Sequence, residues 1–210
     1  VVKGLEVIEP PAAPVLANEN IIAIDASQSM MIEDYKPTRL KSVVIGLDKF
    51  MASRSACDIG LILFGGKAKL ISPITEDSCY SSDLIRTIDH TGLERGTAIG
   101  NAIWLAIQKM PRSNSDKRLV LIGDGDNTAG IPIAAAVELA KKYRVKIYTI
   151  GVGNRGKVPF GRDENGIPNL VENTFSDTDF KSISLKTGGQ YFWAKDAGAV
   201  TSILHKIFSL

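Results

Sequence analysis

Asp25, Ser27 and Ser29 stand at alternate positions directly after a run of apolar residues at 21–24. That run is rich in β-branched side chains, which is typical of a strand buried on both faces of a sheet. A carboxylate and two hydroxyls would then occupy the loop at the carboxyl end of the strand, where open α/β sheets bind their ligands. Such a loop can hold a hard cation, although Asp and Ser are also common in ordinary strand-to-helix turns.

Two further polar residues, Thr97 and Asp124, are expected at the same edge of the sheet. When the direction of the chain is followed through the intervening elements, both residues emerge at the edge that carries Asp25. Thr97 and Asp124 lie close to Asp25 only if the first and fourth strands are neighbours, as in the doubly wound strand order 3-2-1-4-5-6. Asp126 and Asn127 follow at once and are candidates for the rim of such a site, with a role in the turn as the alternative.

The cluster formed by these five residues would offer only hydroxyl and carboxylate oxygens, without Cys or His. Such a ligand set selects a hard cation. Mg²⁺ prefers near-octahedral oxygen coordination and usually keeps several waters, which a small set of hydroxyls allows. Mg²⁺ is therefore the predicted cofactor, with Mn²⁺ or Ca²⁺ as alternatives, and the predicted metal residues are Asp25, Ser27, Ser29, Thr97 and Asp124.

Alternating strand and helix patterns predict an α/β fold with three layers: a doubly wound, Rossmann-like, mostly parallel sheet of six strands with one antiparallel edge strand. Strands are expected at residues 21–24, 59–64, 68–71, 118–122, 146–150 and 190–193. Gly65-Gly66 predicts a two-residue hairpin, which makes the third strand antiparallel. Pro37 suits the first turn of a helix that ends by residue 55. Further helices are expected near residues 82–89, 99–110, 133–140, 180–187 and 200–207.

Residues 20–210 are expected to form one domain, because the chain shows no internal repeat and its length suits a single core. Residues 1–19 contain Pro10, Pro11 and Pro14 and are interpreted as an extended lead-in. Residues 151–177 are rich in Gly, Pro and Asn without a sustained period. We expect this segment to be a long excursion from the rim of the cation site rather than a core element.

Charge and hydropathy exclude several classes of partner. The formal net charge is only +2, and the basic residues are scattered, which argues against nucleic-acid binding. No apolar run approaches the ~20 residues that cross a bilayer, so we expect no direct membrane insertion by this segment. Cys57 and Cys79 form neither a disulfide framework nor a zinc motif, and two unrelated thiols are expected unless the fold brings them together.

Three aromatic residues, Trp104, Tyr191 and Trp193, fall inside expected elements. Packing explains them better than stacking on a ligand.

The Asp-x-Ser-x-Ser at 25–29, the separate Gly-Thr at 96–97 and the Asp-Gly at 124–125 resemble the von Willebrand factor A (VWA) domain with its metal-ion-dependent adhesion site (MIDAS). The resemblance covers nearly all of residues 20–210. It implies that Ser27, Ser29 and Thr97 contact the metal directly or through water. Asp25 and Asp124 would hold it mostly through second-shell water. It also implies metal-bridged protein binding, in which a partner's Asp or Glu carboxylate completes the shell of the cation.

Five other stretches resemble bacterial Bat-type A domains of the aerotolerance operon: Pro-Thr-Arg-Leu at 37–40, Ser-Pro-Ile-Thr at 72–75, Gly-Thr-Ala-Ile-Gly at 96–100, Tyr-Thr-Ile-Gly-Val-Gly at 148–153 and Thr-Gly-Gly-Gln-Tyr-Phe at 187–192. This likeness implies a bacterial cell-envelope protein tethered to the inner membrane by segments outside this sequence, with the periplasmic side favoured. It further implies action with a MoxR-type AAA+ ATPase or with other VWA proteins. Gln28 and Gly123 depart from the family pattern, where Gly and Thr are frequent, and neither is a predicted ligand.

Enzymatic alternatives are weaker. Residues 151–156 match Gly-x-Gly-x-x-Gly, but Pro159 and Gly161 follow where a dinucleotide site needs the start of a helix. A metal-dependent hydrolase would need a base beyond the carboxylates assigned to the ion. The chain has two histidines: His90 is expected in a solvated loop, and His205 is expected to be structural on the last helix. A binding domain rather than an enzyme is expected, with a fold-only domain carrying a vestigial metal site as the remaining alternative.

Overall fold

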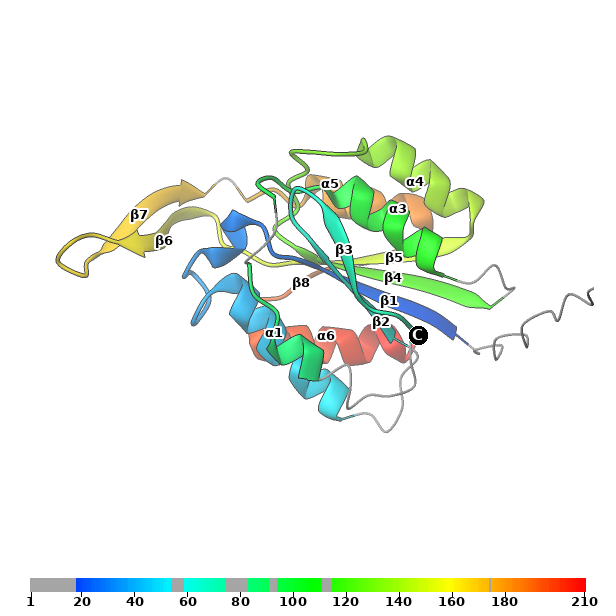
Figure 1. Ribbon diagram of the computed structural model, residues 1–210, viewed down its shortest axis with the longest axis horizontal. Coiled ribbons are helices and arrows are strands. Elements are labelled where there is room, and N and C mark those ends of the chain that lie inside the picture. Colours follow the sequence, from blue (N-terminus) through cyan, green and yellow to red (C-terminus); the bar gives the residue numbers. More distant parts are fainter. Residues whose placement is uncertain (1–17, 54–58, 75–82, 91–93, 111–114, 174) are drawn as a thin grey trace, which may run out of the picture.

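The computed structural model describes residues 18–53, 59–74, 83–90, 94–110, 115–173 and 175–210. A six-stranded sheet in the order β3-β2-β1-β4-β5-β8 forms its centre (Figure 1). All neighbouring pairs are parallel except β2 and β3, so the predicted mostly parallel sheet with one antiparallel edge strand is confirmed. The strands are β1 (Asn18–Asp25), β2 (Ile59–Phe64), β3 (Ala68–Ser72), β4 (Asp116–Gly123), β5 (Val145–Gly151) and β8 (Tyr191–Trp193).

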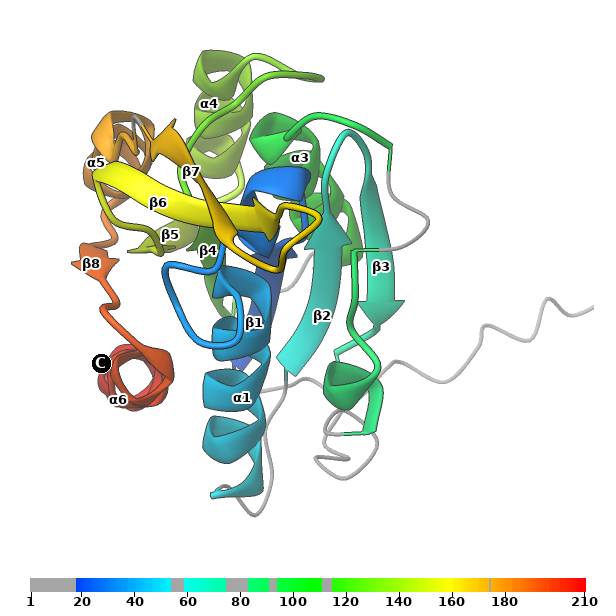
Figure 2. The same ribbon diagram turned by 90° about the vertical axis from the view of Figure 1, so that its left-hand side faces the viewer.

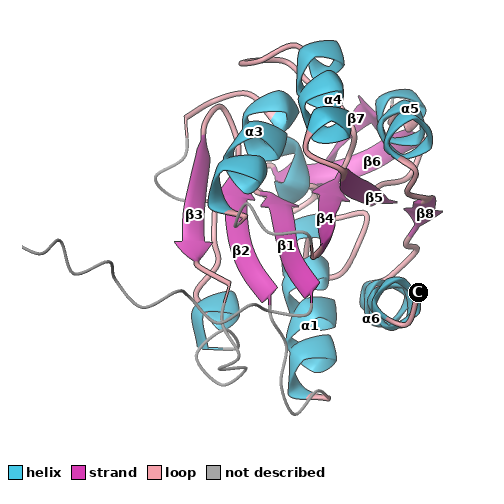
Figure 3. Ribbon diagram, turned by 90° about the vertical axis from the view of Figure 1, so that its right-hand side faces the viewer, coloured by secondary structure: helices cyan, strands magenta, loops and turns pink. Residues whose placement is uncertain are grey.

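Helices cover both faces of this sheet (Figures 1 and 3). One face carries α1 (Arg39–Ala52) and α6 (Ala197–Phe208), and the other carries α3 (Ile99–Lys109), α4 (Ile133–Lys142) and α5 (Thr178–Thr187). The central strand β1 is apolar on both sides because its side chains alternate: Ile22 and Ile24 join the core under α1 and α6, whereas Ile21 and Ala23 join the core under α3, α4 and α5. This double coverage explains the continuous apolar run at its centre.

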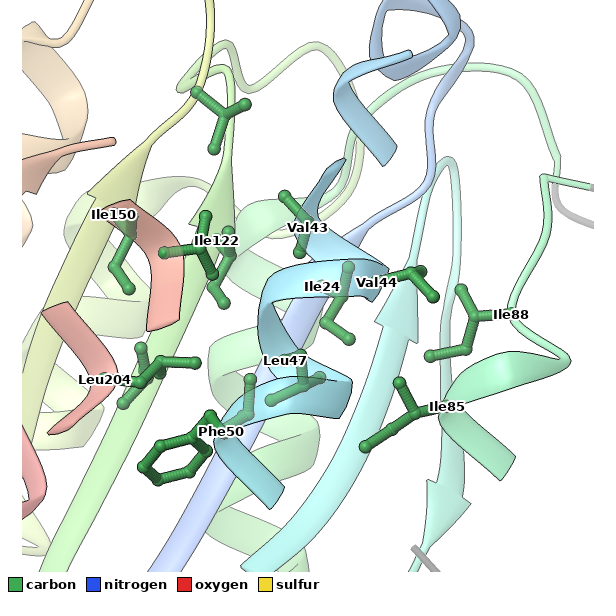
Figure 4. Packing of buried hydrophobic residues seen from close by; sticks show 14 of the residues in the cluster. Ile24, Val43, Val44, Leu47, Phe50, Ile85, Ile88, Ile122, Ile150 and Leu204 are labelled. Carbon is green, nitrogen blue, oxygen red and sulfur yellow. The ribbon is translucent and has the colours of Figure 1, made fainter. Parts of the chain in front are cut away.

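Helix α1 supplies much of the first core. Val43, Leu47 and Phe50 lie on one face of the helix and pack towards the sheet, where Ile24 and Ile122 belong to the same buried cluster (Figure 4). The helix ends at Ala52, within the predicted limit.

The predicted start of α1 was wrong. Thr38 is the N-cap, and its hydroxyl accepts a hydrogen bond from the Lys41 amide at 3.2 Å. Pro37 therefore precedes the helix instead of lying in its first turn. A Thr that can accept the backbone amide three residues later is a strong N-cap, and it fixes the helix start at Arg39.

The turn between β2 and β3 spans residues 65–67, so the hairpin loop has one residue more than predicted. Gly66 approaches the following loop closely: a Cβ built on it would lie 2.3 Å from the carbonyl oxygen of Arg95. Its amide donates to the Glu94 carbonyl at 2.8 Å, and the Gly65 carbonyl accepts from the Ala98 amide at 2.7 Å. The turn thus fixes the segment that leads into α3.

Residues 151–177 are more regular than predicted. They contain an antiparallel hairpin of β6 (Gly156–Arg162) and β7 (Pro168–Asn173), which forms a separate sheet and projects from the body of the molecule (Figures 1 and 2). Most of the hairpin is exposed, although Val158 is buried. Because β7 has no buried face, its sequence shows no alternation of polar and apolar residues, which is why the pattern did not reveal it. The strand that follows Gly156 also excludes the helix a dinucleotide fingerprint needs.

Both tryptophans, for which a packing role was expected, are about half exposed. Trp104 is 45% exposed, because α3 turns Ala102, Ile103 and Ala106 towards the sheet instead. Trp193 is 50% exposed because β8 is a short strand at the edge of the sheet. Tyr191 is partly buried against the second core, as expected.

Several other expectations concern the ends of the described segments. Residues 83–86 form a helical turn inside the predicted 82–89 helix. Gly188 adopts a left-handed conformation (φ 76°) and ends α5, as predicted. Strand β1 already begins at Asn18, whereas the rest of the predicted lead-in, Cys57 and Cys79 lie outside the described residues. Within the described part of the chain, none of the helices combines the length and the apolar character that crossing a bilayer requires.

Candidate metal site

The loop after β1 brings together the first three predicted ligands. Asp25 is the last residue of β1 and is buried, and its Oδ1 accepts a hydrogen bond from the Ser27 amide at 2.8 Å. Ser27 is the N-cap of the short 3-10 helix η1 (Gln28–Met31), whose Met30 is buried in the core. This turn places the hydroxyl oxygens of Ser27 and Ser29 3.0 Å apart. The alternation of polar residues seen in the sequence therefore produces a compact group of oxygen atoms.

Asp124 follows the end of β4, next to β1. A Cβ built on the preceding residue, Gly123, would lie 2.7 Å from the Cβ of Asp25 and 2.9 Å from its Oδ2. A Thr at this position, as is frequent in the family, would not fit without movement of Asp25. Gly123 therefore allows the ends of β1 and β4 to approach closely. The Ser29 hydroxyl also acts to lower the pKa of the Asp124 carboxyl, so the two loops influence each other.

Thr97 is bonded through its backbone to the loop that follows Asp124. Its carbonyl accepts hydrogen bonds from the amides of Thr128 and Ala129 at 2.9 and 3.2 Å, and its own amide donates to the Thr128 hydroxyl at 2.9 Å. Thr97 is also buried. The loop that carries it is thereby bonded to the loop that follows Asp124, as the chain direction predicted.

Two carboxylate oxygens in this cluster lack partners. Asp25 Oδ2 and Asp124 Oδ1 are buried and accept no hydrogen bond within the described part of the chain. Burial raises the pKa of Asp25 well above its ordinary value, and the nearby Asp124 charge raises it further. Burial also raises the pKa of Asp124, although the Ser29 hydrogen bond and the Arg39 charge oppose that shift. Buried, unpaired anionic oxygens are costly unless a cation or a proton compensates them.

Arg39 is a buried residue of the site that the sequence did not reveal. Its Nε and Nη2 donate to the two carboxylate oxygens of Asp34, each at 2.8 Å, and its Nη1 lies 3.5 Å from Asp124 Oδ2. The Asp34 carboxylate also accepts the Asn154 amide at 2.8 Å. Arg39 therefore holds Asp124 in position and connects it with the segment that leads to the β6–β7 hairpin. An Arg at the start of an amphipathic helix looks like a solvent-exposed residue, so spacing gives no signal for this role.

The two rim candidates differ in what they do. Asn127 Oδ1 accepts the amides of Ile99 and Gly100 at 2.8 and 3.4 Å, so it caps the start of α3 and favours the turn role. Asp126 is exposed at the same loop, and partial burial of its carboxyl together with the Asp124 charge raises its pKa.

The arrangement fits a hard cation held by hydroxyls and two carboxylates. Among the described residues, no three His, Cys, Asp or Glu side chains gather into a metal-binding group. A cation at this edge would therefore rely on Ser27, Ser29 and Thr97 as much as on the aspartates. The partnerless oxygens of Asp25 and Asp124 suit this ligand set, because they can accept hydrogen bonds from water on a metal ion.

Known proteins resemble this chain in sequence and in fold. An uncharacterized protein of Borreliella burgdorferi is 29% identical over an alignment of 185 residues, and the match covers 84% of this chain and 53% of that protein. A UPF0353 protein of Mycolicibacterium paratuberculosis is 27% identical over an alignment of 194 residues, and the match covers 85% of this chain and 56% of that protein. The chain thus spans about half the length of these curated relatives.

A solved structure with a similar fold is that of an aerotolerance-related membrane protein from Bacteroides fragilis, with a TM-score of 0.78 and 26% identity. The match covers 91% of this chain and 98% of that one. BatB from Bacteroides thetaiotaomicron gives the same TM-score at 24% identity, covering 91% and 97% of the two chains, and supports the fold.

Metal binding is known among more distant structures of this fold. Proximal thread matrix protein 1 of the mussel byssus, with a TM-score of 0.67 and 15% identity over 90% of this chain and 44% of that one, has been solved with a zinc-occupied MIDAS motif. Residues 21–191, which include every predicted ligand, match the von Willebrand factor type A domain. With the six-stranded sheet and the polar cluster at the carboxyl ends of β1 and β4, this match shows that the chain belongs to the von Willebrand factor type A domain family.

Proposed function

We propose that this domain binds proteins through a divalent cation held at the carboxyl edge of its sheet. The observation that carries the proposal is the pair of buried, partnerless aspartate oxygens beside two serine hydroxyls 3.0 Å apart. The cation would be Mg²⁺, with Mn²⁺ or Ca²⁺ as substitutes, and its residues would be Asp25, Ser27, Ser29, Thr97 and Asp124.

The role of the cation follows from the charge of its ligands. Hydroxyl oxygens are neutral, so a cation bound mainly by Ser27, Ser29 and Thr97 retains most of its positive charge. Asp25 and Asp124 would act on it largely through coordinated water. Arg39 reduces the negative charge further, because its guanidinium lies against Asp124. A cation in this setting attracts a carboxylate from outside, and an Asp or Glu side chain of a partner protein supplies it.

A binding role is preferred to catalysis. The carboxylates beside the proposed cation are those that hold it, and Arg39 carries no proton that it can exchange near neutral pH. His90 and His205 are both exposed, and His205 contacts Ser53 and Phe50 on the α1–α6 side of the sheet. A hydrolase would need a separate base at the cation.

The proposed setting is a bacterial aerotolerance-type protein at the cell envelope. The similarity to the aerotolerance-related membrane protein of B. fragilis supports it, and so does the fact that the chain spans only about half of its curated relatives. The domain would be tethered to the inner membrane by other segments, with the periplasmic side favoured. A MoxR-type AAA+ ATPase or another VWA protein would be its partner.

Calorimetric titration with MgCl₂ and MnCl₂ tests the metal. The wild-type domain is expected to bind one ion, and the Ser27→Ala/Ser29→Ala variant to lose that binding. Ser202→Ala is the matched control, because Ser202 is exposed on α6 and its hydroxyl donates only to a backbone carbonyl within that helix. Equal binding by the wild type and the double variant would refute the proposed site.

The partner is tested with a purified MoxR-type ATPase from the same genome. Co-precipitation is expected in Mg²⁺, and it should be lost in EDTA and with the Ser27→Ala/Ser29→Ala variant. Association that persists in both arms would show that this edge of the sheet does not bridge the two proteins through a cation.

A further inference from the structure

A cavity of about 340 Å³ opens beside the proposed cation site, between β8 and the base of the β6–β7 hairpin. Its walls include the side chains of Phe175, Tyr191 and Trp193 and the backbone of Gly153. Phe175 is buried and Trp193 is half exposed. The cavity therefore has aromatic walls of different depth, and its volume lies at the lower end of the range of small-molecule pockets, which suits one large side chain.

The aromatic walls are fixed in place by specific contacts. The Trp193 indole Nε1 donates to the Gly153 carbonyl at 3.1 Å, which holds the ring across the mouth of the cavity. Gly153 has φ 148°, and a Cβ on it would lie 3.0 Å from both Phe175 Cδ2 and Arg39 Cζ. A larger residue at 153 would therefore push the aromatic wall and the buried guanidinium apart.

Gly153 also separates the cavity from the cation site. Arg39 packs against one side of it and places Nη1 3.5 Å from Asp124, whereas Trp193 bonds to its carbonyl. Only one residue of backbone and one side chain thus stand between the aromatic cavity and a predicted metal residue. Since an extended chain advances about 3.3 Å per residue, a short segment of a partner can reach both places.

The charges at the rim favour an acidic segment. Arg155 is 72% exposed, and within the described part of the chain it forms one long ion pair, 3.9 Å from Asp177. Lys181 already lies 2.8 Å from the same carboxylate, so two cations share one anion. At this part of the rim, Arg155 and Lys181 therefore place two positive charges against the single carboxylate of Asp177.

The Tyr191 hydroxyl adds a polar group to the wall. Within the described part of the chain it makes no hydrogen bond of ordinary geometry, and it is shielded from solvent. Burial raises the pKa of Tyr191, and the nearby Asp177 charge raises it further, so the hydroxyl keeps its proton at neutral pH.

We propose that this cavity is a specificity pocket for an aromatic side chain on the acidic segment of a partner protein, whose Asp or Glu binds the cation next to it. This inference rests on the proposed function and adds a second point of contact to it. The cation would supply affinity for any suitable carboxylate, whereas the pocket would choose among acidic segments by the residue that lies a few positions away.

Blocked peptides test the pocket directly. The probes are acetyl-Asp-(Gly)n-Phe-amide with one, two or three glycines and the same series ending in Ala, titrated in Mg²⁺ into ¹⁵N-labelled domain. For the spacer that fits, the Phe peptide is expected to bind about tenfold more tightly than its Ala counterpart, as burial of much of one aromatic ring implies. It should shift the indole N–H signal of Trp193 and leave that of Trp104 unchanged.

Variants separate the pocket from the metal. Trp193→Ala should reduce the affinity of the Phe peptide to that of the Ala peptide, and Trp104→Ala, which removes a similarly exposed ring from α3, should not. In Ser27→Ala/Ser29→Ala both peptides should bind more weakly while the preference for Phe persists. Equal affinities of the Phe and Ala peptides, with binding still dependent on Mg²⁺, would overturn the pocket and leave the proposed function standing.

Two other outcomes would overturn the assignment for different reasons. Binding of both peptides that is indifferent to Mg²⁺ would refute the proposed function, and the two-point contact would fail with it. A Trp193 signal that shifts with protein concentration in the absence of peptide would show that a second copy of this chain occupies the pocket instead.

Discussion

Burial of the Asp25 carboxylate lowers the stability of the metal-free domain, although the same carboxylate is proposed to help hold the cation. Asp25 is buried, one of its oxygens has no partner among the described residues, and its pKa is raised well above 3.8, chiefly by burial. The folded state therefore holds the Asp25 proton more tightly than the unfolded chain does. For this group, the free energy of unfolding falls as the pH rises from about 3.8 through the raised pKa, and above it the full penalty remains.

Asp25→Asn should therefore stabilise the domain in metal-free buffer at neutral pH. The amide keeps an oxygen that can accept the Ser27 amide, which now bonds to Asp25 Oδ1 at 2.8 Å, and it removes the buried charge. Urea unfolding with EDTA from pH 4 to 8 measures the effect. The advantage of the variant over the wild type should grow with pH and then level off, and Mg²⁺ should stabilise only the wild type. A variant that is less stable than the wild type across this range would contradict the account.

Arg39 should be the most costly charged residue to remove. Arg39→Met would leave Asp34 buried without its bidentate partner and Asp124 without its neighbouring cation. Breaking a buried ion pair by removing one member costs about 3–5 kcal/mol, whereas an exposed pair contributes below about 1 kcal/mol.

Urea unfolding of Arg39→Met and of Arg86→Met checks this prediction. Arg86 is 59% exposed and pairs with Asp48 at 3.2 Å, so it serves as the matched control. Comparable losses of unfolding free energy in the two variants would show that the Arg39 network contributes no more than a surface pair.

At the scale of elements, the β2–β3 turn positions the Thr97 loop. A Cβ at Gly66 would lie 2.3 Å from the Arg95 carbonyl oxygen, so Gly66→Ala should displace the loop without changing any predicted ligand. Changes in the support of a metal site typically reduce affinity about 10- to 100-fold.

Calorimetric titration of Gly66→Ala with Mg²⁺ measures this loss. Gly198→Ala is its control, since a Cβ there would meet only the Asp196 carboxylate at 3.3 Å in the first turn of α6. Unchanged affinity in Gly66→Ala would mean that the turn does not position Thr97 for the cation.

The elements also show what the sequence could predict. The core strands were found because continuous apolar runs occupy their centres, and the edge that carries Asp25 and Asp124 followed from chain direction. The β6–β7 hairpin was missed because exposed strands have no apolar period. The exposure of Trp193 was missed because its short apolar segment looks like a buried strand, although β8 lies at the edge of the sheet.

At the scale of the whole molecule, stability should be unevenly distributed. Strands β1, β4 and β5 are covered by helices on both faces, whereas the β6–β7 hairpin is a separate two-stranded sheet. A two-stranded ribbon is marginally stable by itself, and amides that open locally exchange faster than those that need global unfolding.

Hydrogen exchange followed by mass spectrometry tests this expectation. Amides of residues 159–171 should exchange well before those of residues 20–24 and 119–122. Uniform protection of the hairpin and the central strands would show that the hairpin unfolds only with the rest of the domain.

In the proposed site, three loops of the domain meet around one divalent cation. Paramagnetic broadening by Mn²⁺ in the NMR spectrum of the ¹⁵N-labelled domain tests it most directly. The account predicts that substoichiometric Mn²⁺ broadens the amides of residues 26–29, 97–98 and 124–127 first, spares α4 and β3, and loses this selectivity in Ser27→Ala/Ser29→Ala. Broadening centred elsewhere, such as at the acidic tip of the hairpin at Asp163 and Glu164, would contradict the proposed site. An identical pattern in the double variant would also contradict it.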